Sequence, residues 1–295
     1  MDRVRVAPYL AILVGVVGVS FASIFIRLSG APPLVIAAYR MGIASMMLFS
    51  IALCVSGFRE LRRLSAEEFF GLTAVGLVLA AHFSFWTTSL SYTSVASSVI
   101  LVNLSPVFVA LASHLFFQEK VNPRMGLGIA LAFLGASIIA VEDAGLGETS
   151  LQGVVYALVG ALTLAIYLLS GRRLRQRLSL FSYVLPVYGT CTVSLMAVCS
   201  VMAIPLYPYA PKEYLLFTAL AVIPTIFGHT LYNWALKYVE TPITAVSLLG
   251  EPVGATLLAM AILNEVPSST TLVGGALTLT GIFITAKFRA QRLSD

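Results

Sequence analysis

Charged residues are scarce in this chain of 295 residues. Lysine, arginine, aspartate and glutamate make up 11% of it, whereas hydrophobic residues make up 59%. Soluble domains usually carry about 25% charged residues. So few charges cannot cover the surface of a 31.5 kDa globule in water, and the mean hydropathy of +0.94 points the same way. The sequence therefore predicts an integral membrane protein.

Several motifs of enzymes and of ATP-driven proteins are missing. The chain has no Walker A sequence, no HExxH pair and no GxSxG elbow, and its apolar segments contain no pair of carboxylates. Its three cysteines lie singly in apolar segments, without CxxC spacing. These absences argue against an enzyme, a metal site, a cofactor or transport driven by ATP.

Long apolar runs are abundant. A helix needs about 20 apolar residues to cross a bilayer core of about 30 Å, whereas a β-barrel would alternate in segments of about ten residues. The first run is too long for a signal peptide, and comparable runs follow it, so we expect it to be retained. Ten runs predict ten helices, five in each half, at residues 8–26, 34–55, 69–89, 95–117, 125–141, 151–170, 181–204, 214–236, 243–263 and 272–286.

The two halves of the chain repeat each other. Residues 92–137 align without a gap with residues 238–283, and the aligned pairs include Pro106 with Pro252. Because five crossings are an odd number, the second unit must lie upside down relative to the first. We therefore expect an all-α membrane protein with two inverted five-helix repeats around a central cavity. The expected divisions are a first repeat at 1–143, an outer linker at 144–150, a second repeat at 151–288 and a cytoplasmic tail at 289–295.

The basic residues lie mainly on one side of this arrangement. The net charge is +5 and the isoelectric point is near 9.2. If the N-terminus is cytoplasmic, most of the lysines and arginines fall in cytoplasmic segments, as the positive-inside rule requires. This predicts a prokaryotic-type inner membrane location with both termini cytoplasmic. The basic clusters are then topology signals with minor lipid contact, not a nucleic-acid site.

Three segments resemble a known transporter family. They are VGVVGVSFASIFIRLSGAPPLVIAAYR in the first two predicted helices, SLSYTSVASSVILVNLSPVFVALASHLFFQEKV around the fourth, and its counterpart ALKYVETPITAVSLLGEPVGATLLAMAILNEV. Over nearly the whole chain, the sequence resembles the EamA-type branch of the drug/metabolite transporter superfamily. The resemblance implies a ten-helix carrier with a central cavity. It also implies substrates that range from amino acids and other metabolites to toxic cations and nucleotide sugars.

Polar and aromatic side chains share one face on two predicted helices. A histidine inside a bilayer is costly without a partner or water, so we expect both faces to point into the bundle. There they would line the cavity, or else form interhelical hydrogen bonds and aromatic packing. The residues are His82, Phe85, Trp86 and Ser89 in the first half and His229, Tyr232 and Asn233 in the second. Further candidates for the cavity lining are Asn103, Ser105 and Tyr167.

Glu251 is isolated, with no other acidic residue between Glu240 and Glu265. A charge at mid-span costs about 2.5–3.5 kcal/mol on insertion scales. Glu251 is therefore expected to couple protons, to anchor a substrate amine, or to form a structural ion pair with Arg40. Arg40 is also isolated, and it is expected to snorkel outward or to bind a carboxylate from the substrate or from Glu251.

Pro106 and Pro252 occupy equivalent places in the two halves. Each removes an amide donor and crowds the carbonyl four residues earlier. Both are expected to bend their helices, either as gating kinks or as static ones.

Glu119 and Glu265 follow the two proline-containing helices. The C-terminal end of a helix disfavours an acid, so each is expected to have a specific partner. We interpret both as structural latches between helices within each repeat, with gating as the second possibility.

Together these features predict a secondary-active, alternating-access carrier of small molecules. An exporter of amino acids or related metabolites is the first expectation. A proton-coupled efflux carrier for toxic organic cations is the alternative, and a lipid-translocating or channel-like protein is a second one. The expected partners are a small-molecule substrate and membrane lipid, with proton coupling left open.

Overall fold

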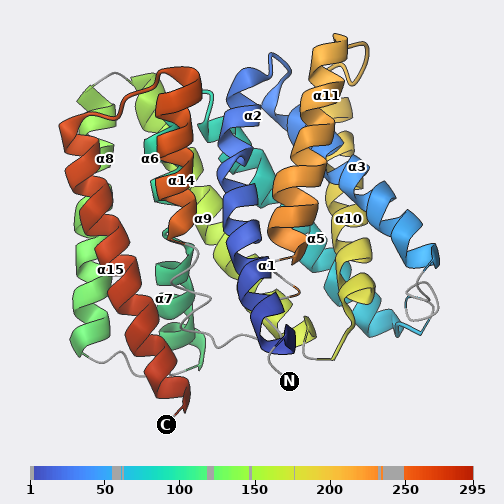
Figure 1. Cartoon of the computed structure of the whole chain (residues 1–295), viewed down its shortest axis with the longest axis horizontal. Helices are drawn as coiled ribbons and strands as arrows, with labels where there is room; N and C mark the ends of the chain where they lie inside the picture. The colour runs from blue at the N-terminus through green and yellow to red at the C-terminus, as the bar shows by residue number, and fades with distance from the viewer. Residues whose placement is uncertain are drawn as a thin grey trace.

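The computed structural model describes residues 3–54, 61, 63–117, 123–145, 148–175, 177–231, 234 and 249–294. Within these ranges the protein is built from helices, which form one bundle with both termini at the same end (Figure 1). In chain order the helices are α1 (Arg3–Ser20), α2 (Ala22–Leu28), α3 (Pro33–Cys54), α5 (Ala66–Ser89), α6 (Val95–Val102), α7 (Ser105–Phe117), α8 (Pro123–Gly145), α9 (Glu148–Arg175), α10 (Leu180–Val201), α11 (Pro211–Leu220), the π-helix η1 (Ala221–Thr230), α14 (Gly250–Leu258), the π-helix η2 (Ala259–Leu263) and α15 (Ser269–Ser294).

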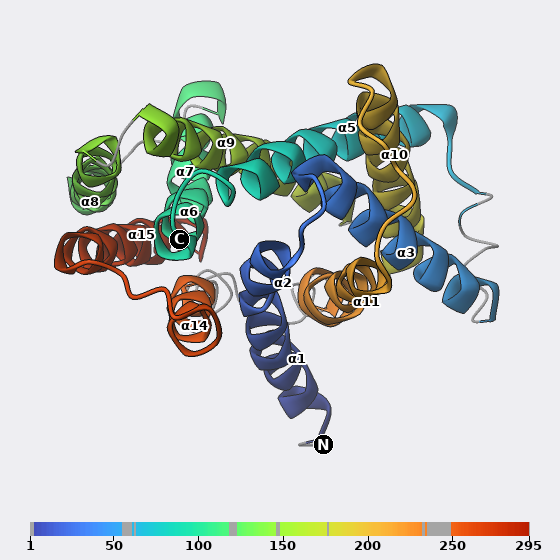
Figure 2. The same ribbon diagram turned by 90° about the horizontal axis from the view of Figure 1, so that it is seen from above.

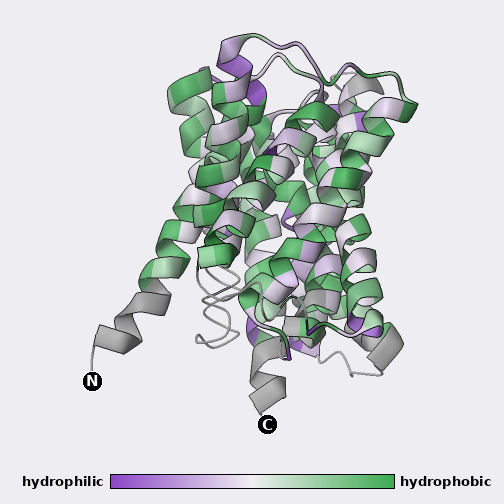
Figure 3. Cartoon of the chain, turned by 90° about the vertical axis from the view of Figure 1, so that its right-hand side faces the viewer, coloured by the Kyte–Doolittle hydropathy of each residue, from purple (hydrophilic) through white to green (hydrophobic). Residues whose placement is uncertain are grey.

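In the part of the chain that the structure describes, nine helical segments are long and apolar enough to cross a membrane. A tenth apolar segment, Gly250–Leu263, is shorter, and the first residues of the span expected there lie outside the described ranges. Hydrophobic residues cover most of the length of the helices, and hydrophilic ones gather mainly at the two ends (Figure 3). The prediction of an all-helical, multi-pass membrane protein is confirmed.

Four of the predicted spans are not single regular helices, and in one of them, the ninth, α14 continues as the π-helix η2. The first is divided at Phe21, and the fourth is divided at Asn103 and Leu104, just before Pro106. Pro106 therefore lies at the start of α7, where a missing amide donor costs little. The break ahead of it is helped by Asn103, whose side chain donates to the Val99 carbonyl over 2.9 Å.

The eighth span changes from an α-helix to a π-helix around Pro224. Pro224 has no amide proton for the carbonyl of Leu220, four residues earlier. The hydroxyl of Thr225 donates to that carbonyl over 2.8 Å. π-Helical turns often mark functional sites, and this one lies in the middle of the bundle.

Helices α8 and α15 pack closely through glycines and lie side by side in both views (Figures 1 and 2). A Cβ on Gly135 would lie 2.4 Å from the Gly274 carbonyl oxygen, and one on Gly281 would lie 2.5 Å from that of Gly128. Only glycine permits this approach of two helix backbones. Shifting each number by 146 converts the Gly128–Gly281 contact into the Gly274–Gly135 contact.

The same exchange relates other helix pairs. Helix α3 contacts α10, α5 contacts α9, and α1 contacts η1. Moving each helix five spans along the chain maps the α3–α10 pair onto itself and exchanges the α5–α9 pair with the α1–η1 pair. This is the pattern that two equivalent halves would produce. The inverted relation between the halves, and the division at 144–150, stay predictions.

Candidate functional site

Arg40 lies in the interior of the bundle. It projects from α3 on the same face as Ile36, Ala37 and Ala44, and only 1% of its surface is exposed. Its Nε donates to the Thr225 hydroxyl in η1 over 2.7 Å. Arg40 is therefore enclosed in the bundle and does not snorkel outward. Its hydrogen bond to Thr225 joins the first half of the chain to the second.

Aromatic rings cover the guanidinium group of Arg40. Its central carbon lies 4.6 Å from the centroid of the Phe83 ring and 5.9 Å from that of Trp86. Cations over aromatic faces are stabilised by the ring quadrupole, more so where water is excluded. Phe83 and Trp86 thus offset part of the free-energy cost of burying this charge, although neither ring carries a negative charge.

Within the part of the chain that the structure describes, both Nη atoms of Arg40 lack a hydrogen-bond acceptor, and so does the indole Nε1 of Trp86. Trp86 is only 3% exposed. Buried donors are nearly always paired in native proteins, and an unpaired one costs about 1–3 kcal/mol, or more when it is charged. Three unpaired donors in one place therefore need a physical explanation.

His82 lies next to this group on α5. Its Nδ1 donates to the Gly160 carbonyl of α9 over 2.9 Å, and its ring stacks on Trp86 with centroids 6.0 Å apart. Gly160 allows the approach, since a Cβ there would lie 3.3 Å from Trp86. The interaction fixes the orientation of the His82 ring and, through it, that of the indole.

The second half contributes side chains from α10 and η1. The His229 ring lies edge-on to Phe83 with centroids 6.2 Å apart. The Tyr188 hydroxyl lies 3.2 Å from the Thr230 hydroxyl, and both Tyr188 and Cys191 are close enough to Arg40 to interact with it electrostatically. We call Arg40, His82, Phe83, Trp86, Tyr188, Thr225 and His229 the central cluster.

Glu251 lies half-buried at the start of α14, beside the central cluster. Its carboxyl group interacts with the Asn103 side chain and electrostatically with Arg40. However, the described residues contain no Arg40–Glu251 ion pair, and the one ion pair found among them joins Arg27 to Glu265. Arg40 and Glu251 thus occupy one electrostatic environment without neutralising each other by direct contact.

The structure brings several of the predicted cavity residues together and separates others. Phe85 lies against Tyr156 with centroids 6.0 Å apart, whereas Phe83, which the sequence pattern did not indicate, lies at Arg40. Ser105 and Tyr167 are buried, and Tyr167 interacts with Tyr188. Ser89 pairs with Ser98 over 2.6 Å. Three predicted residues lie outside the described ranges, namely Glu119, Tyr232 and Asn233.

The site residues predicted from the sequence did not include four that lie here: Phe83, Tyr188 and Thr225 of the central cluster, and Cys191 beside it. Phe83 precedes Trp86 by three positions, so it could have been placed on the same face of α5. Thr225 directly follows a proline within a span, which is a sign of a local helix defect. For Tyr188 and Cys191 we find no signal in the single sequence.

Acidic side chains fasten the end of the bundle that lies opposite the two termini, called here the distal end (Figure 1). Arg27 donates from Nη2 to Glu265 over 3.2 Å and from Nη1 to the Leu90 carbonyl over 2.8 Å. The other oxygen of Glu265 accepts the backbone amide of Val95, at the first turn of α6. Glu265 was expected to join helices of its own repeat. Instead its contacts join the second half to the first, because the free amides of the α6 N-terminus lie within reach.

Three further acids act at the distal end. Glu213 at the start of α11 accepts from Ser29 and from the Gly30 amide, ahead of α3. Two acids at the end of α8 hold the starts of α6 and α15: Asp143 accepts from Thr93, and Glu142 accepts from Thr271 over 2.8 Å. These contacts hold the helix ends together at the distal end.

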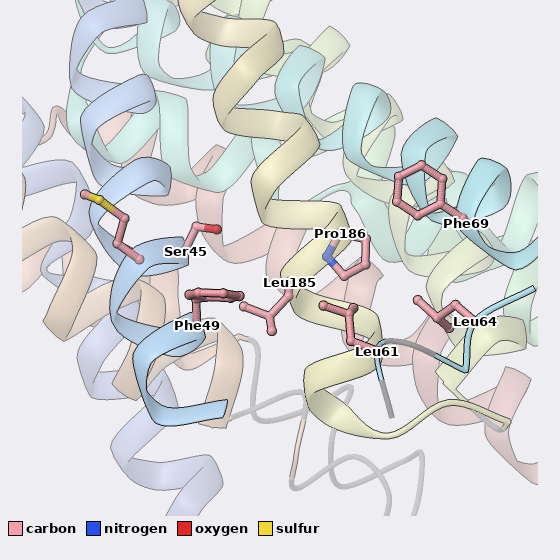
Figure 4. Close-up of a pocket in the computed structure, with 8 residues that line it drawn as sticks. Ser45, Phe49, Leu61, Leu64, Phe69, Leu185 and Pro186 are labelled. Carbon is pink, nitrogen blue, oxygen red and sulfur yellow. The ribbon is translucent and has the colours of Figure 1, made fainter. Parts of the chain in front are cut away.

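A separate cavity of about 410 Å³ lies between α3, α10 and the segment that leads into α5 (Figure 4). Its walls are apolar apart from the Ser45 hydroxyl, and they include Phe49, Phe69, Leu185 and Pro186. None of the predicted site residues lines it. With a single polar group, it offers little chemistry for selecting a polar substrate, so the central cluster is the better candidate site.

Comparison with known proteins extends these observations. An uncharacterized transporter of Archaeoglobus fulgidus is 26% identical over 280 residues, which is 92% of this chain and 94% of that protein. A probable terminal-alkyne amino-acid exporter of Streptantibioticus cattleyicolor is 25% identical over 250 residues, or 83% and 82% of the two chains. A riboflavin transporter of Brucella anthropi is 32% identical over 140 residues, or 47% and 45%.

A solved structure titled "Crystal structure of protein" has the same fold. It superposes with a TM-score of 0.68 and 20% sequence identity, covering 98% of this chain and 99% of that one. The model of the EamA-like transporter family matches this chain twice, at residues 6–141 and 151–287. With its apolar helices and buried polar centre, the chain therefore belongs to the EamA-like transporter family, whose members are membrane transporters and not enzymes.

Proposed function

We propose that the protein is a secondary-active carrier that exports an amino acid or a related metabolite across a prokaryotic inner membrane by alternating access. The observation that carries this proposal is the central cluster. It places charged, polar and aromatic side chains from both halves of the chain in the middle of an apolar bundle, where such groups are costly and usually mark a transport pathway.

The contacts at the distal end support alternating access. A substrate at the central cluster can reach the distal side only if the contacts of Glu265 and Glu213 part. Because Glu265 joins the two halves, a movement of one half against the other would break its contacts while leaving each half intact. A rocking of repeats around a fixed central site is the usual way in which such carriers work.

The charge of the centre favours an amino acid over an organic cation. Among the described residues Arg40 has no counter-ion in direct contact, so an incoming cation would meet a buried like charge. The name of the Streptantibioticus relative also indicates an amino-acid cargo, whereas the riboflavin transporter shows that the family carries other metabolites. Glu251 remains the proposed group for proton coupling or for an amine.

Counterflow in proteoliposomes tests the proposal. Vesicles that contain the purified protein are loaded with one unlabelled amino acid at a time, and uptake of the labelled compound is followed without ATP. We expect saturable uptake that is stimulated by the internal compound. Conductive flux that does not saturate would indicate a channel. Counterflow of quaternary amines but of no amino acid would favour cation efflux.

A further inference from the structure

We propose that Arg40 binds the carboxylate of the substrate, through its two unpaired Nη donors and with the indole N–H of Trp86 as a third donor. This inference rests on the proposed transport function and names its substrate class, a small molecule with one carboxylate group. Zwitterionic amino acids fit best, because their ammonium group would face Glu251.

The first argument is the geometry of the unpaired donors. Thr225 holds Nε, and Phe83 and Trp86 cover the guanidinium plane. The fork of two Nη atoms is therefore oriented but not occupied by any acceptor among the described residues. A carboxylate matches such a fork with two parallel hydrogen bonds, and charge-assisted bonds of this kind are about twice as strong as neutral ones.

The second argument is the balance of charge. Glu251 interacts with Arg40 but does not pair with it directly, and both lie in the same environment. Arg40 thus supplies one cation, and the carboxyl group of Glu251 lies near it without direct contact. A zwitterion satisfies both groups, whereas a phosphate dianion would bring two negative charges to a single guanidinium. Burying either charge without a partner is unfavourable, so a ligand of matching charges stabilises the site.

The third argument concerns access. Arg40 and Trp86 are 1% and 3% exposed, so ligand can reach them only when the surrounding helices part. An enclosed site of this kind is what a carrier needs between its two open states. A purely structural arginine would instead be expected to use its Nη atoms to hold neighbouring carbonyls.

The chain offers a direct optical probe of this site. It has two tryptophans, Trp86 and Trp234. In a Trp234→Phe background the emission comes from Trp86 alone, whose ring lies 5.9 Å from the guanidinium carbon. The purified protein in detergent is titrated with the proteinogenic amino acids other than tryptophan and tyrosine, which would themselves emit. Each amino acid that changes the emission is then compared with its primary amide and its decarboxylated amine. We expect the acid to bind at least about tenfold more tightly than its amide.

Variants separate recognition from packing. Arg40→Gln should lower the affinity for the acid to that for the amide while changing the amide's own affinity little. Ser45→Ala changes a residue of the same helix in the separate apolar cavity, so it should preserve the preference for the acid. Equal loss of preference in Ser45→Ala and Arg40→Gln would assign Arg40 a packing role and overturn the proposal.

Other outcomes are also decisive. If Arg40→Gln does not fold, the comparison of acid with amide in the Trp234→Phe protein decides the question alone. Amides or amines that bind as well as acids, or a panel in which no carboxylate binds, would overturn the carboxylate site. Saturable counterflow of a compound without a carboxylate would then leave the carrier function standing. Absence of counterflow for every compound would instead overturn the carrier function.

Discussion

At the scale of single residues, the separation of Arg40 from Glu251 is the most informative feature. A direct ion pair between them would have indicated that both residues have a structural role. Instead each keeps partners that leave part of its hydrogen-bonding capacity open, since Arg40 uses only Nε and Glu251 faces an amide. The Arg40 charge is therefore available to a ligand, and the Glu251 carboxyl group is available to a ligand or to a proton.

Replacing Glu251 by glutamine tests this availability. The amide keeps the size and polarity of the side chain but can neither hold a negative charge nor take part in proton coupling. We expect Glu251→Gln to lower counterflow at least about tenfold or to uncouple it from pH, with normal amounts of folded protein. Glu68→Gln serves as control, because Glu68 lies in the exposed capping box of α5. Normal transport by Glu251→Gln with unchanged pH dependence would show that the charge has no transport role.

The limits of sequence reasoning are also clearest at this scale. Hydropathy indicated that the faces of His82 and His229 point inward, because a polar side chain among apolar ones has few other places. It could not decide between Phe83 and Phe85, since both flank the inward face of α5. The contacts of Arg40 with Thr225 and Tyr188 depend on how α3 meets η1 and α10, which no local pattern encodes.

At the scale of helices, composition predicted the spans but not their defects. The apolar run from 95 to 117 was expected as one bent helix, and the structure divides it into α6 and α7. Pro106 marks the break, and Asn103 lies at it, with its side-chain and backbone N–H groups both donating to the Val99 carbonyl. The π-helix around Pro224 was not predicted, because such a defect is decided by which groups pair with the freed carbonyl.

The contact between α8 and α15 gives a matched test at this scale. A methyl group on Gly135 would collide with the backbone of α15, whereas one on Gly71 in α5 would meet nothing within 4 Å. We expect Gly135→Ala to destabilise the protein by about 1–3 kcal/mol through overpacking. Gly71→Ala should be neutral or stabilising, since alanine favours helix by about 1 kcal/mol over glycine. Thermal unfolding in detergent measures both, and equal melting temperatures would contradict the close approach.

At the scale of the whole molecule, the distal contacts hold the helix ends together on the side opposite the termini. The ion pair between Arg27 and Glu265 is partly exposed, with 36% and 20% of the two side chains accessible. Exposed pairs of this kind contribute about 0.2–1 kcal/mol. A contribution of that size can be overcome if the helix ends part.

Glu265→Gln should loosen the distal end. The variant keeps an oxygen for the Val95 amide but loses the charge that attracts Arg27. We expect hydrogen–deuterium exchange in the first turn of α6 to rise by about twofold to fivefold, while exchange at the termini-side start of α5 stays unchanged. Exchange at α6 equal to that of the unaltered protein would show that Glu265 does not hold the distal helix ends together.

The glycine contact of α8 with α15 has a further consequence. Because exchanging the halves maps this contact onto itself, each half carries a surface complementary to its own copy, as in an isologous dimer. Two separate half-length chains with this surface would bury the same backbone-to-backbone seam. The surface along which the halves meet therefore does not depend on their being joined in one chain.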